Sequence, residues 1–331
     1  MSGRLTGRVT RTTQSLVKMY KGKSVALVIP ARNEEKLIRP TLEHVPKTVD
    51  KIYVIDDGST DNTAKVVREI AKKDKRITLL QHEKNLGPGY AIITGYKRAS
   101  ADGYDIAVVI GGDYQMDLRD LPNFLEPLVK GEADYTKGNR FLEGGFSEYK
   151  MPLVRLIGNS ALTFITKMAS GYWKLFDTQD GYTAITKEAI DRVNWDYAKA
   201  GYGYVSDFLI TFSLYNIRVK DVPRRAIYRP GERQSQIKIL KYMATVTPRL
   251  IRKFFWRINK RYLLLDFHPL VLFYYLAFIM LPMGLALGVK ILFEALHGPI
   301  SGNQVVLTAL LLIMGTQFLL FAILFDMEQN S

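Results

Sequence analysis

The stretch Val54-Ile55-Asp56-Asp57-Gly58-Ser59-Thr60-Asp61 places two adjacent carboxylates directly after an apolar, β-branched run. The pattern returns at Val108-Val109-Ile110-Gly111-Gly112-Asp113-Tyr114-Gln115-Met116-Asp117. Apolar runs of this kind are typical of parallel strands that are buried on both faces of a sheet. Open α/β sheets bind their ligands at the carboxyl ends of such strands, so the two acidic turns predict where a binding site lies.

Strand-like and helix-like segments alternate along the chain from Ser24 onward. We expect strands over residues 25–29, 51–55, 77–81 and 106–110, and helices over residues 34–44, 60–72 and 89–99. Ser59 or Thr60 is expected to cap the helix over 60–72. Alternation of this kind predicts an α/β domain with a mostly parallel, nucleotide-binding sheet flanked by helices on both faces.

Two long, uncharged apolar segments lie near the C-terminus. Residues 267–289 read FHPLVLFYYLAFIMLPMGLALGV, and residues 305–325 read VVLTALLLIMGTQFLLFAILF. Each can cross a bilayer, because about 20 apolar residues suffice. The alternative, a buried helical hairpin of a soluble protein, fits less well because both runs are long and uniformly apolar. We therefore predict two transmembrane helices, at about 267–296 and 304–325.

Basic residues gather next to these segments. The chain has 46 Lys and Arg against 32 Asp and Glu, a net charge of +14. Residues 236–265 contain many of these cations and no acid. Beside apolar spans, such a stretch favours anionic membrane lipids over nucleic acid as the partner. The link between the spans has no Lys or Arg. We therefore expect a two-span protein of the cell membrane with its catalytic domain and both termini in the cytoplasm.

The chain is expected to divide into four parts. Residues 1–23 form a basic N-terminal arm, and residues 24–235 form the catalytic domain, which includes an interfacial amphipathic helix at 150–170. Residues 236–265 form basic interfacial helices interrupted at Pro248, and residues 266–331 hold the two spans. The chain has no Cys, which excludes disulfides and thiolate zinc sites. Its four His are not at metal-ligand spacing.

The acidic turns offer hard oxygen ligands. Asp113 and Gln115 could supply a carboxylate and an amide oxygen to Mg²⁺ or Mn²⁺, and such an ion pairs well with a nucleotide diphosphate. The neighbouring carboxylates of Asp56 and Asp57 repel each other, so hydrogen bonds or a ligand must offset their charge. Helix capping is the plainer alternative for one of them.

Four motifs in a fixed order resemble those of family 2 glycosyltransferases: PARNEE at 30–35, DDGSTDNT at 56–63, NLGPGYAIITGY at 85–96 and GDYQMD at 112–117. With the two C-terminal spans, the chain is similar to the polyprenyl-phosphate branch of that family, such as dolichyl-phosphate mannose or glucose synthases. The resemblance implies a glycosyltransferase A-type fold. It also implies inverting transfer of one sugar from a UDP- or GDP-linked donor to a polyprenyl or dolichyl phosphate, giving a lipid-linked monosaccharide for glycosylation.

The resemblance also assigns roles to individual residues. Those expected at the nucleotide are Pro30, Ala31, Arg32, Glu34, Asp56, Asp57, Gly87 and Gly112; at the chemistry, Asp113, Gln115 and Asp177; at the acceptor phosphate, Arg140 and Arg155; and in a loop over the donor, Arg229 and Ser235. Asp113 and Gln115 would hold the Mg²⁺ or Mn²⁺. One position departs from the family, because Gly111 stands where an Asp usually completes an acidic pair with Asp113.

The reaction is physically reasonable for these residue types. A phosphate monoester has a second pKa of about 6, so the acceptor is largely ionised at pH 7 and needs little or no general base. The enzyme must instead hold two anions in line, with a cation at the leaving diphosphate and arginines at the acceptor.

Two other functions stay open at this point. A membrane polysaccharide synthase would share the catalytic domain, but it needs more spans and usually a Gln-x-x-Arg-Trp motif. An inactive, sugar-nucleotide-binding membrane scaffold is favoured by Gly111. The sugar (glucose, mannose or N-acetylglucosamine), the base of the donor and self-association as a homo-oligomer are also open.

Overall fold

The computed structural model describes residues 20–142, 153–198, 201, 203–225 and 239–330, of which 153–157, 159 and 239–243 are described by their backbone alone. Its centre is a sheet of seven strands in the order β3-β2-β1-β4-β6-β5-β7. The strands are β1 (Val25–Ala31), β2 (Lys51–Asp56), β3 (Ile77–Gln81), β4 (Ile106–Val109), β5 (Tyr135–Asn139), β6 (Thr183–Thr186) and β7 (Val219–Pro223). Strands β1 to β4 run parallel, β5 runs parallel to β7, and β6 is antiparallel to both of its neighbours.

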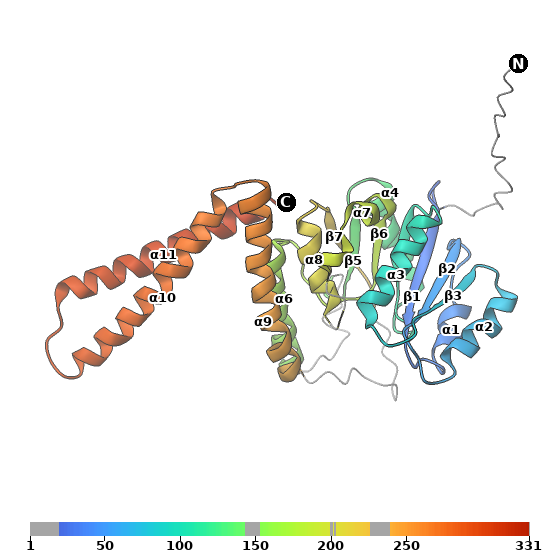
Figure 1. Ribbon diagram of the computed structural model, residues 1–331, viewed down its shortest axis with the longest axis horizontal. Helices are drawn as coiled ribbons and strands as arrows, with labels where there is room; N and C mark the ends of the chain where they lie inside the picture. Colours follow the sequence, from blue (N-terminus) through green and yellow to red (C-terminus); the bar gives the residue numbers. More distant parts are fainter. Residues whose placement is uncertain (1–19, 143–152, 199–200, 202, 226–238, 331) are drawn as a thin grey trace, which may run out of the picture.

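Helices cover both faces of this sheet (Figure 1). Val25, Leu27 and Ile29 of β1 pack with α1 (Ile38–Glu43), α2 (Thr63–Lys73) and α4 (Leu121–Val129). Ala26 and Val28 point the other way, toward α3 (Pro88–Ala101), α7 (Lys187–Arg192) and α8 (Tyr204–Ser213). Two short 3-10 turns, η1 (Leu118–Asp120) and η2 (Trp195–Tyr197), complete the domain. Because side chains alternate along a strand, both faces of β1 are buried, as the continuous apolar run requires.

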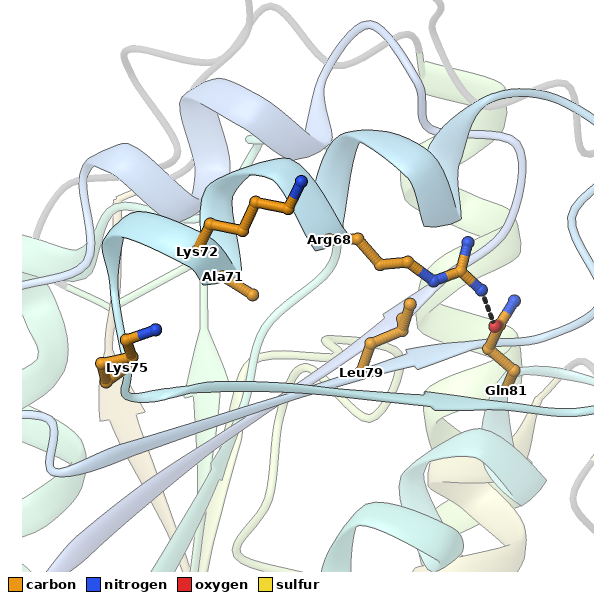
Figure 2. A pocket seen from close by; sticks show the side chains of 6 residues that line it. All are labelled: Arg68, Ala71, Lys72, Lys75, Leu79 and Gln81. Carbon is orange, nitrogen blue, oxygen red and sulfur yellow. Dashed lines mark hydrogen bonds between the residues drawn. The ribbon is translucent and has the colours of Figure 1, made fainter.

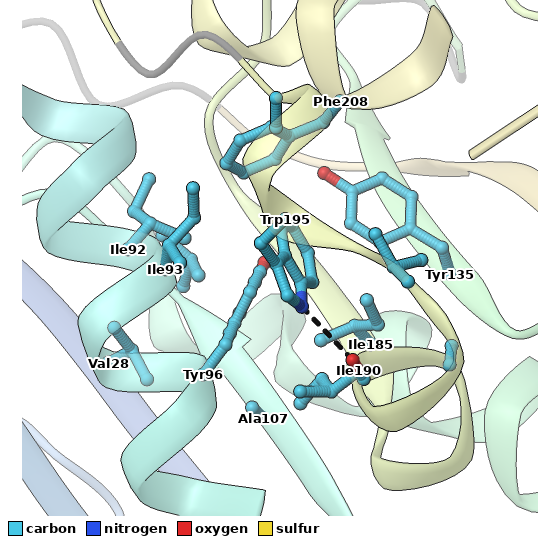
Figure 3. Packing of buried hydrophobic residues seen from close by; sticks show 14 of the residues in the cluster. Val28, Ile92, Ile93, Tyr96, Ala107, Tyr135, Ile185, Ile190, Trp195 and Phe208 are labelled. Atoms are coloured by element: carbon cyan, nitrogen blue, oxygen red, sulfur yellow. Dashed lines mark hydrogen bonds between the residues drawn. The ribbon is translucent and has the colours of Figure 1, made fainter. Parts of the chain in front are cut away.

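The second of these cores is rich in aromatic residues (Figure 3). Trp195 lies between Tyr96 and Phe208, with ring centroids 5.5 Å and 5.3 Å away. Its Nε1 donates a hydrogen bond to the carbonyl of Ile190 at 3.0 Å, so the buried indole keeps a polar partner. This core packs α7 and α8 against the face of the sheet to which Ile185 of the antiparallel strand β6 points.

The predicted mostly parallel α/β sheet is confirmed, with two local differences. The helix expected over 34–44 begins only at Ile38. The predicted cap at Ser59 or Thr60 is wrong, because α2 begins at Thr63, whose backbone N–H is held by the carboxylate of Asp61 at 3.0 Å. Ser59 instead accepts a hydrogen bond from the backbone N–H of Asn33 at 3.0 Å, which ties the two strand ends together.

Two long helices lie side by side between the sheet and a helical hairpin (Figure 1). They are α6 (Leu153–Ser170) and α9 (Ile239–Ile258), and α9 continues into a short π-helical segment, η3 (Asn259–Leu265). The expected break at Pro248 does not occur, since α9 runs through it. Val246, Leu250 and Phe254, spaced four apart on either side of the proline, are all buried in one cluster, which favours a continuous helix.

The hairpin consists of α10 (Leu270–Ala295) and α11 (Gly302–Glu328), both long and apolar enough to cross a membrane. Only 28% and 17% of their most apolar stretches are buried, so these helices are not the core of a soluble domain. They approach closely at two glycines. A Cβ on Gly284 or on Gly315 would lie 2.9 Å from a leucine side chain of the opposite helix. Small residues at the crossing are typical of helix pairs in membranes.

Candidate active site

A cleft of about 550 Å³ opens at the carboxyl ends of β1, β2 and β4. Its floor comes from these strand ends, and its far wall comes from the start of β6 and of α8. The lining residues are Pro30, Ala31, Arg32, Glu34, Asp57, Asn85, Leu86, Gly87, Pro88, Val109, Gly111, Gly112, Asp113, Met116, Gly181, Gly201 and Tyr204. The position agrees with the rule for ligands of open α/β sheets.

Most of the residues expected at the nucleotide line this cleft. They are Pro30, Ala31, Arg32, Glu34, Asp57, Gly87 and Gly112, together with Asp113. Asp56 and Gln115 lie just outside the lining. The carboxylate of Asp56 accepts hydrogen bonds from Ser59 N at 3.1 Å and from Gln81 Nε2 at 3.0 Å, so it holds the turn.

Asp57 organises one wall of the cleft. Its Oδ1 accepts from the backbone N–H of Leu86 at 2.9 Å, and its Oδ2 accepts from that of Gly87 at 2.8 Å. His82 Nδ1 lies 2.8 Å from Oδ1, and the other ring nitrogen lies 3.0 Å from Thr94 Oγ1. The side chain of Asp57 is almost fully buried. Asp57 therefore places the loop that leads into the N-terminus of α3, an end of a helix that favours negative charge.

The turn after β4 is shaped by small residues. A Cβ on Gly111 would lie 2.8 Å from Oδ1 of Asp113, and one on Gly112 would lie 3.3 Å from Cβ of Ala31. Oδ1 of Asp113 accepts from the backbone N–H of Gln115 at 3.3 Å. The carboxylate of Asp113 thus lies against the space that an Asp side chain at position 111 would need.

The acidic side chains near the cleft fit only one mode of metal binding, in which the substrate supplies most of the ligands. In the described part of the chain, no three His, Asp or Glu side chains gather closely enough to hold an ion. Mg²⁺ commonly uses only one or two protein carboxylates, with substrate phosphates and water completing its shell. Asp113 at the cleft lining is compatible with that mode.

A buried network of charges adjoins the cleft. Arg140 donates from Nε to Oδ2 of Asp177 at 2.6 Å and from Nη2 to Oδ1 at 3.0 Å. Its Nε also lies 3.4 Å from Oδ2 of Asp180, which accepts from Arg224 Nε at 2.6 Å. Asp180 directly precedes Gly181 of the cleft lining. Two of the residues expected from the sequence, Arg140 and Asp177, are thus brought together beside the cleft.

Lys137 supports the network from β5. Its side chain is fully buried, with Nζ 3.0 Å from Oδ1 of Asp221, and it also donates to the carbonyl of Asp177. Burial alone would raise the pKa of Asp177, but the charge and hydrogen bonds of Arg140 outweigh it and hold that pKa below its ordinary value. The carboxylate is therefore ionised at neutral pH.

An apolar groove of about 120 Å³ also adjoins this network. It is lined by Phe141, Ser160, Thr163, Phe164, Lys167 and Phe176. Phe141 and Phe176 are the chain neighbours of Arg140 and Asp177, and their rings meet edge to face at 5.5 Å. The ammonium of Lys167 lies 5.5 Å from the ring of Phe176, and burial lowers its pKa. The groove, later called the aromatic groove, is thus half aromatic and carries one cation.

Three expected residues cannot be placed. Arg155 lies in α6 without a described side chain, and Arg229 and Ser235 lie outside the described residues. Sequence reasoning in turn missed Tyr204 and Gly201 of the cleft and Lys137 and Arg224 of the charge network. A signal was present for Lys137 only, as a cation inside a strand-forming segment.

A second hollow, of about 410 Å³, lies between α2 and the edge strand β3 (Figure 2). Arg68, Ala71, Lys72, Lys75, Leu79 and Gln81 line it, and Arg68 donates a hydrogen bond to Gln81. None of these six residues was singled out from the sequence, and they include no carboxylate. The cleft at the strand ends is therefore the better candidate for chemistry.

Comparison with known proteins agrees with this geometry. The model of a family described as glycosyl transferase family 2 matches residues 26–193. A UDP-N-acetylglucosamine–dolichyl-phosphate N-acetylglucosaminyltransferase from Methanococcus voltae is 33% identical over 220 residues, which cover 62% of this chain and 86% of that protein. A dolichol-phosphate mannosyltransferase from Pyrococcus furiosus is 27% identical over 176 residues, covering 51% of this chain and 48% of that one.

Among solved structures, glucosyl-3-phosphoglycerate synthase from Mycobacterium tuberculosis, in complex with Mn²⁺ and UDP-glucose, is similar in fold. The TM-score is 0.51 at 21% sequence identity, with 72% of this chain and 79% of that chain covered. At this level of identity the likeness concerns the fold.

Proposed function

Because this chain belongs to glycosyl transferase family 2, and is therefore a glycosyltransferase, we propose that it moves one sugar from a nucleotide sugar to a polyprenyl phosphate such as dolichyl phosphate. Its Methanococcus voltae relative is named for that acceptor and for UDP-N-acetylglucosamine. The donor proposed first is accordingly a UDP-linked sugar. A GDP-linked sugar is the competing choice, and the Pyrococcus furiosus relative, named as a mannosyltransferase, makes mannose a candidate sugar.

One observation carries the proposal. The paired charges of Arg140 and Asp177 adjoin both hollows: Asp180, next to Gly181 of the cleft, contacts Arg140, and the chain neighbours Phe141 and Phe176 line the aromatic groove. A nucleotide sugar suits the cleft, because its walls are backbone, small residues and a few polar groups. The first isoprene units of a lipid suit the aromatic groove, and its phosphate would then lie at the charges between the two.

The proposed reaction inverts the anomeric carbon. An oxygen of the acceptor phosphate forms a bond to the anomeric carbon while the bond from that carbon to the diphosphate oxygen breaks, and the nucleoside diphosphate leaves with the electron pair. The acceptor is already an anion at neutral pH, so no side chain has to remove a proton. Catalysis then consists of alignment and charge stabilisation.

Asp177 is proposed to orient Arg140 for the acceptor. A guanidinium has five N–H donors in a planar fork, and Asp177 takes two of them. The guanidinium of Arg140 would then already be fixed before the acceptor binds. Binding of the lipid phosphate would therefore not have to restrict this side chain in each catalytic cycle. Arg155 of α6 is proposed as the second phosphate contact.

A divalent cation, Mg²⁺ or Mn²⁺, would be held by Asp113 and by the diphosphate itself, with Gln115 as the second protein ligand proposed from the sequence. When bound, the ion supplies charge stabilisation for the leaving diphosphate. Asp57 and the turn of Gly111 and Gly112 would meanwhile keep the walls of the cleft in place for the nucleotide.

The domain boundaries and the membrane topology belong to the same proposal. Residues 24–235 would form the catalytic domain, α6 and the stretch 236–265 would lie at the membrane interface, and α10 and α11 would span the bilayer. The basic stretch and the uncharged link between the spans support a cytoplasmic catalytic domain and transfer on the cytoplasmic leaflet.

A donor screen tests the function directly. Purified protein in lipid nanodiscs receives dolichyl phosphate and, in turn, UDP-N-acetylglucosamine, UDP-glucose and GDP-mannose with Mn²⁺ or Mg²⁺, and the lipid product is identified by mass. We expect one lipid-linked monosaccharide, lost in Asp113→Ala. A polymeric product would instead support a polysaccharide synthase. Donor binding without any product from a folded preparation would support the scaffold alternative.

A further inference from the structure

The end of the last helix meets the end of α6 at a buried pair of charges. Arg257 in α9 and Asp326 in α11 both have 0% of their side chains exposed. Arg257 donates from Nη1 to Oδ1 of Asp326 at 2.8 Å and from Nη2 to Oδ2 at 2.7 Å. This planar, two-point pairing is the strongest geometry that a guanidinium and a carboxylate can form.

The same guanidinium also holds the end of α6. Nη2 of Arg257 donates to the carbonyl of Met168 at 3.1 Å. Met168 lies in the last turn of α6, where carbonyl groups have no partner within the helix. A cation at this end of a helix is favourable in addition because of the helix dipole. Arg257 therefore links the ends of two helices that are far apart in the sequence.

Residues of η3 and of the segment that follows α11 complete the cluster around Asp326. Tyr262 donates to Oδ1 of Asp326 at 2.7 Å, and Asn330 Nδ2 donates to the carbonyl of Asp326 at 2.7 Å. Arg261 donates to Oδ1 of Asn330 at 2.6 Å and to Oδ1 of Asn216 at 2.8 Å. Asn216 follows α8 in the sheet domain, so the segment after α11 is attached to that domain at a second point.

Gly171 shows how closely the two parts meet. It follows α6 directly with φ +79°, and a Cβ there would lie 2.5 Å from Nδ2 of Asn330 and 2.8 Å from Nη1 of Arg257. Any larger residue would require the ends of the Asn330 and Arg257 side chains to shift. The contact is thus built into the sequence on both sides.

The position of α6 matters for the acceptor. Thr163, Phe164 and Lys167 of α6 form one side of the aromatic groove, whose other side is Phe141 and Phe176. Met168 is the next residue after Lys167. Because a helix is a stiff element, fixing the carbonyl of Met168 also fixes Lys167 and the other groove residues on the preceding turns of α6.

We infer that Arg257 and Asp326 are positioning residues for the transfer: they lock the end of α6 to the end of α11 and so hold the aromatic groove in register with Arg140 and Asp177. The inference rests on the proposed function in that it needs a lipid phosphate as acceptor. The end of α11 and the residues up to Asn330 are then part of the acceptor site's support as well as of the membrane anchor.

The test replaces the pair as a unit. The double variant Arg257→Met with Asp326→Leu removes the lock without leaving one buried charge unpaired. With full-length protein in nanodiscs, we expect KM for dolichyl phosphate to rise about tenfold or more, as for a small misplacement of reacting groups. The dissociation constant for UDP, which probes the cleft alone, should stay at the wild-type value.

The chain offers a matched control at the other end of the hairpin. Lys290 and Glu294 form an exposed pair at 3.5 Å, and the variant Lys290→Met with Glu294→Leu removes it. This control should keep the wild-type KM for dolichyl phosphate. If the main double variant fails to fold, Arg257→Lys keeps the charge but loses the planar fork, and the same rise in KM is expected for it on a smaller scale.

A structural readout does not depend on activity. Because the chain has no Cys, spin labels can be placed at Ser160→Cys on α6 and Lys72→Cys on α2 without a background. The distance distribution should broaden in the Arg257→Met, Asp326→Leu variant and stay narrow in the control.

An unchanged KM and an unchanged distance distribution in the folded variant would overturn the inference, as would equal losses of UDP binding and turnover. A wild-type protein that makes no lipid-linked product would refute the proposed function instead.

Discussion

Asp57 and Gly87, thirty positions apart in the sequence, are joined by a hydrogen bond of 2.8 Å from the backbone N–H of Gly87 to Oδ2 of Asp57. The other oxygen of Asp57 accepts from Leu86 and faces His82. The carboxylate thus acts on the cleft through the loop that it holds. The strand end is joined in this way to the N-terminus of α3, where a nucleotide's negative charge would be stabilised.

Replacing Asp57 should therefore affect donor binding. In Asp57→Asn, one oxygen becomes an NH₂ group that faces a backbone N–H, so at least one hydrogen bond is lost. We expect the dissociation constant for UDP to rise about tenfold, the equivalent of one hydrogen bond to a charged group. Isothermal titration of the purified protein measures it. Asp74→Asn is a suitable control, because Oδ1 of Asp74 also accepts a hydrogen bond from a backbone N–H, that of Arg76 at 3.0 Å, and neither residue lines the cleft. An equal effect in Asp74→Asn would contradict the assignment.

The turn after β4 gives a second prediction. Gly111→Ala places a Cβ 2.8 Å from Oδ1 of Asp113, so the carboxylate must move. We expect the Mn²⁺ concentration for half-maximal activity to rise about tenfold, as for the loss of one charge-assisted contact. Gly298→Ala is the control, since a Cβ on Gly298 meets nothing within 4 Å. Unchanged Mn²⁺ dependence in Gly111→Ala would show that Asp113 does not hold the ion.

The sheet shows what sequence patterns can reveal. Strands β1, β2 and β4 were predictable because each is a run of apolar, β-branched residues that is buried on both faces, and the cleft residues at their ends, such as Pro30 and Asp113, followed from that. The edge strand β3 was predictable from the same kind of apolar run, although only Ile77 is buried in it. β5 was not predictable in the same way, because Tyr135-Thr136-Lys137-Gly138-Asn139 contains a lysine that is fully buried and whose partners, Asp221 and the carbonyl of Asp177, are distant in the sequence. Tertiary partners decide such a segment.

The far wall of the cleft was missed for a related reason. Tyr204 and Gly201 reach the cleft only because β6 runs antiparallel beside β4, so that the chain returns past the strand ends. Pairing between strands about 75 residues apart leaves no local signal. The structural role of Asp57, which holds the backbone N–H groups of Leu86 and Gly87, could not be read from the sequence for the same reason.

The paired charges of Arg140 and Asp177 predict a dependence of stability on pH. The pKa of Asp177 is lowered in the folded protein, so its contribution is fully present above the unfolded value of about 4 and is lost as the pH falls through the lower folded value. Asp177→Asn should lower the free energy of unfolding by roughly 3 kcal/mol near pH 7, as when one partner of a buried pair is removed.

Thermal unfolding of both proteins, followed by circular dichroism over the range from about pH 6 to pH 2, measures the difference. The gap between wild type and Asp177→Asn should narrow as the pH falls below about 4. Asp191→Asn is the exposed control, since the pair of Asp191 with Lys187 is open to water and should contribute little. A gap that stays constant down to the lowest pH would mean that folding does not lower the pKa of Asp177.

The aromatic groove predicts a dependence on the lipid chain of the acceptor. Phe176→Ala removes a ring that packs edge to face on Phe141 and lies 5.5 Å from the ammonium of Lys167. If the groove holds the first isoprene units, KM should rise up to about tenfold for a long polyprenyl phosphate, because a lost aromatic contact is worth roughly 0.5 to 1.5 kcal/mol. A short phosphate monoester without isoprene units, such as ethyl phosphate, lacks this contact and should show a smaller change. Phe267→Ala, at a side chain that is 83% exposed beside the hairpin, tests whether any lost aromatic residue near the membrane has the same effect. Equal changes in the two variants, or equal changes for the long and short acceptors, would place the lipid elsewhere.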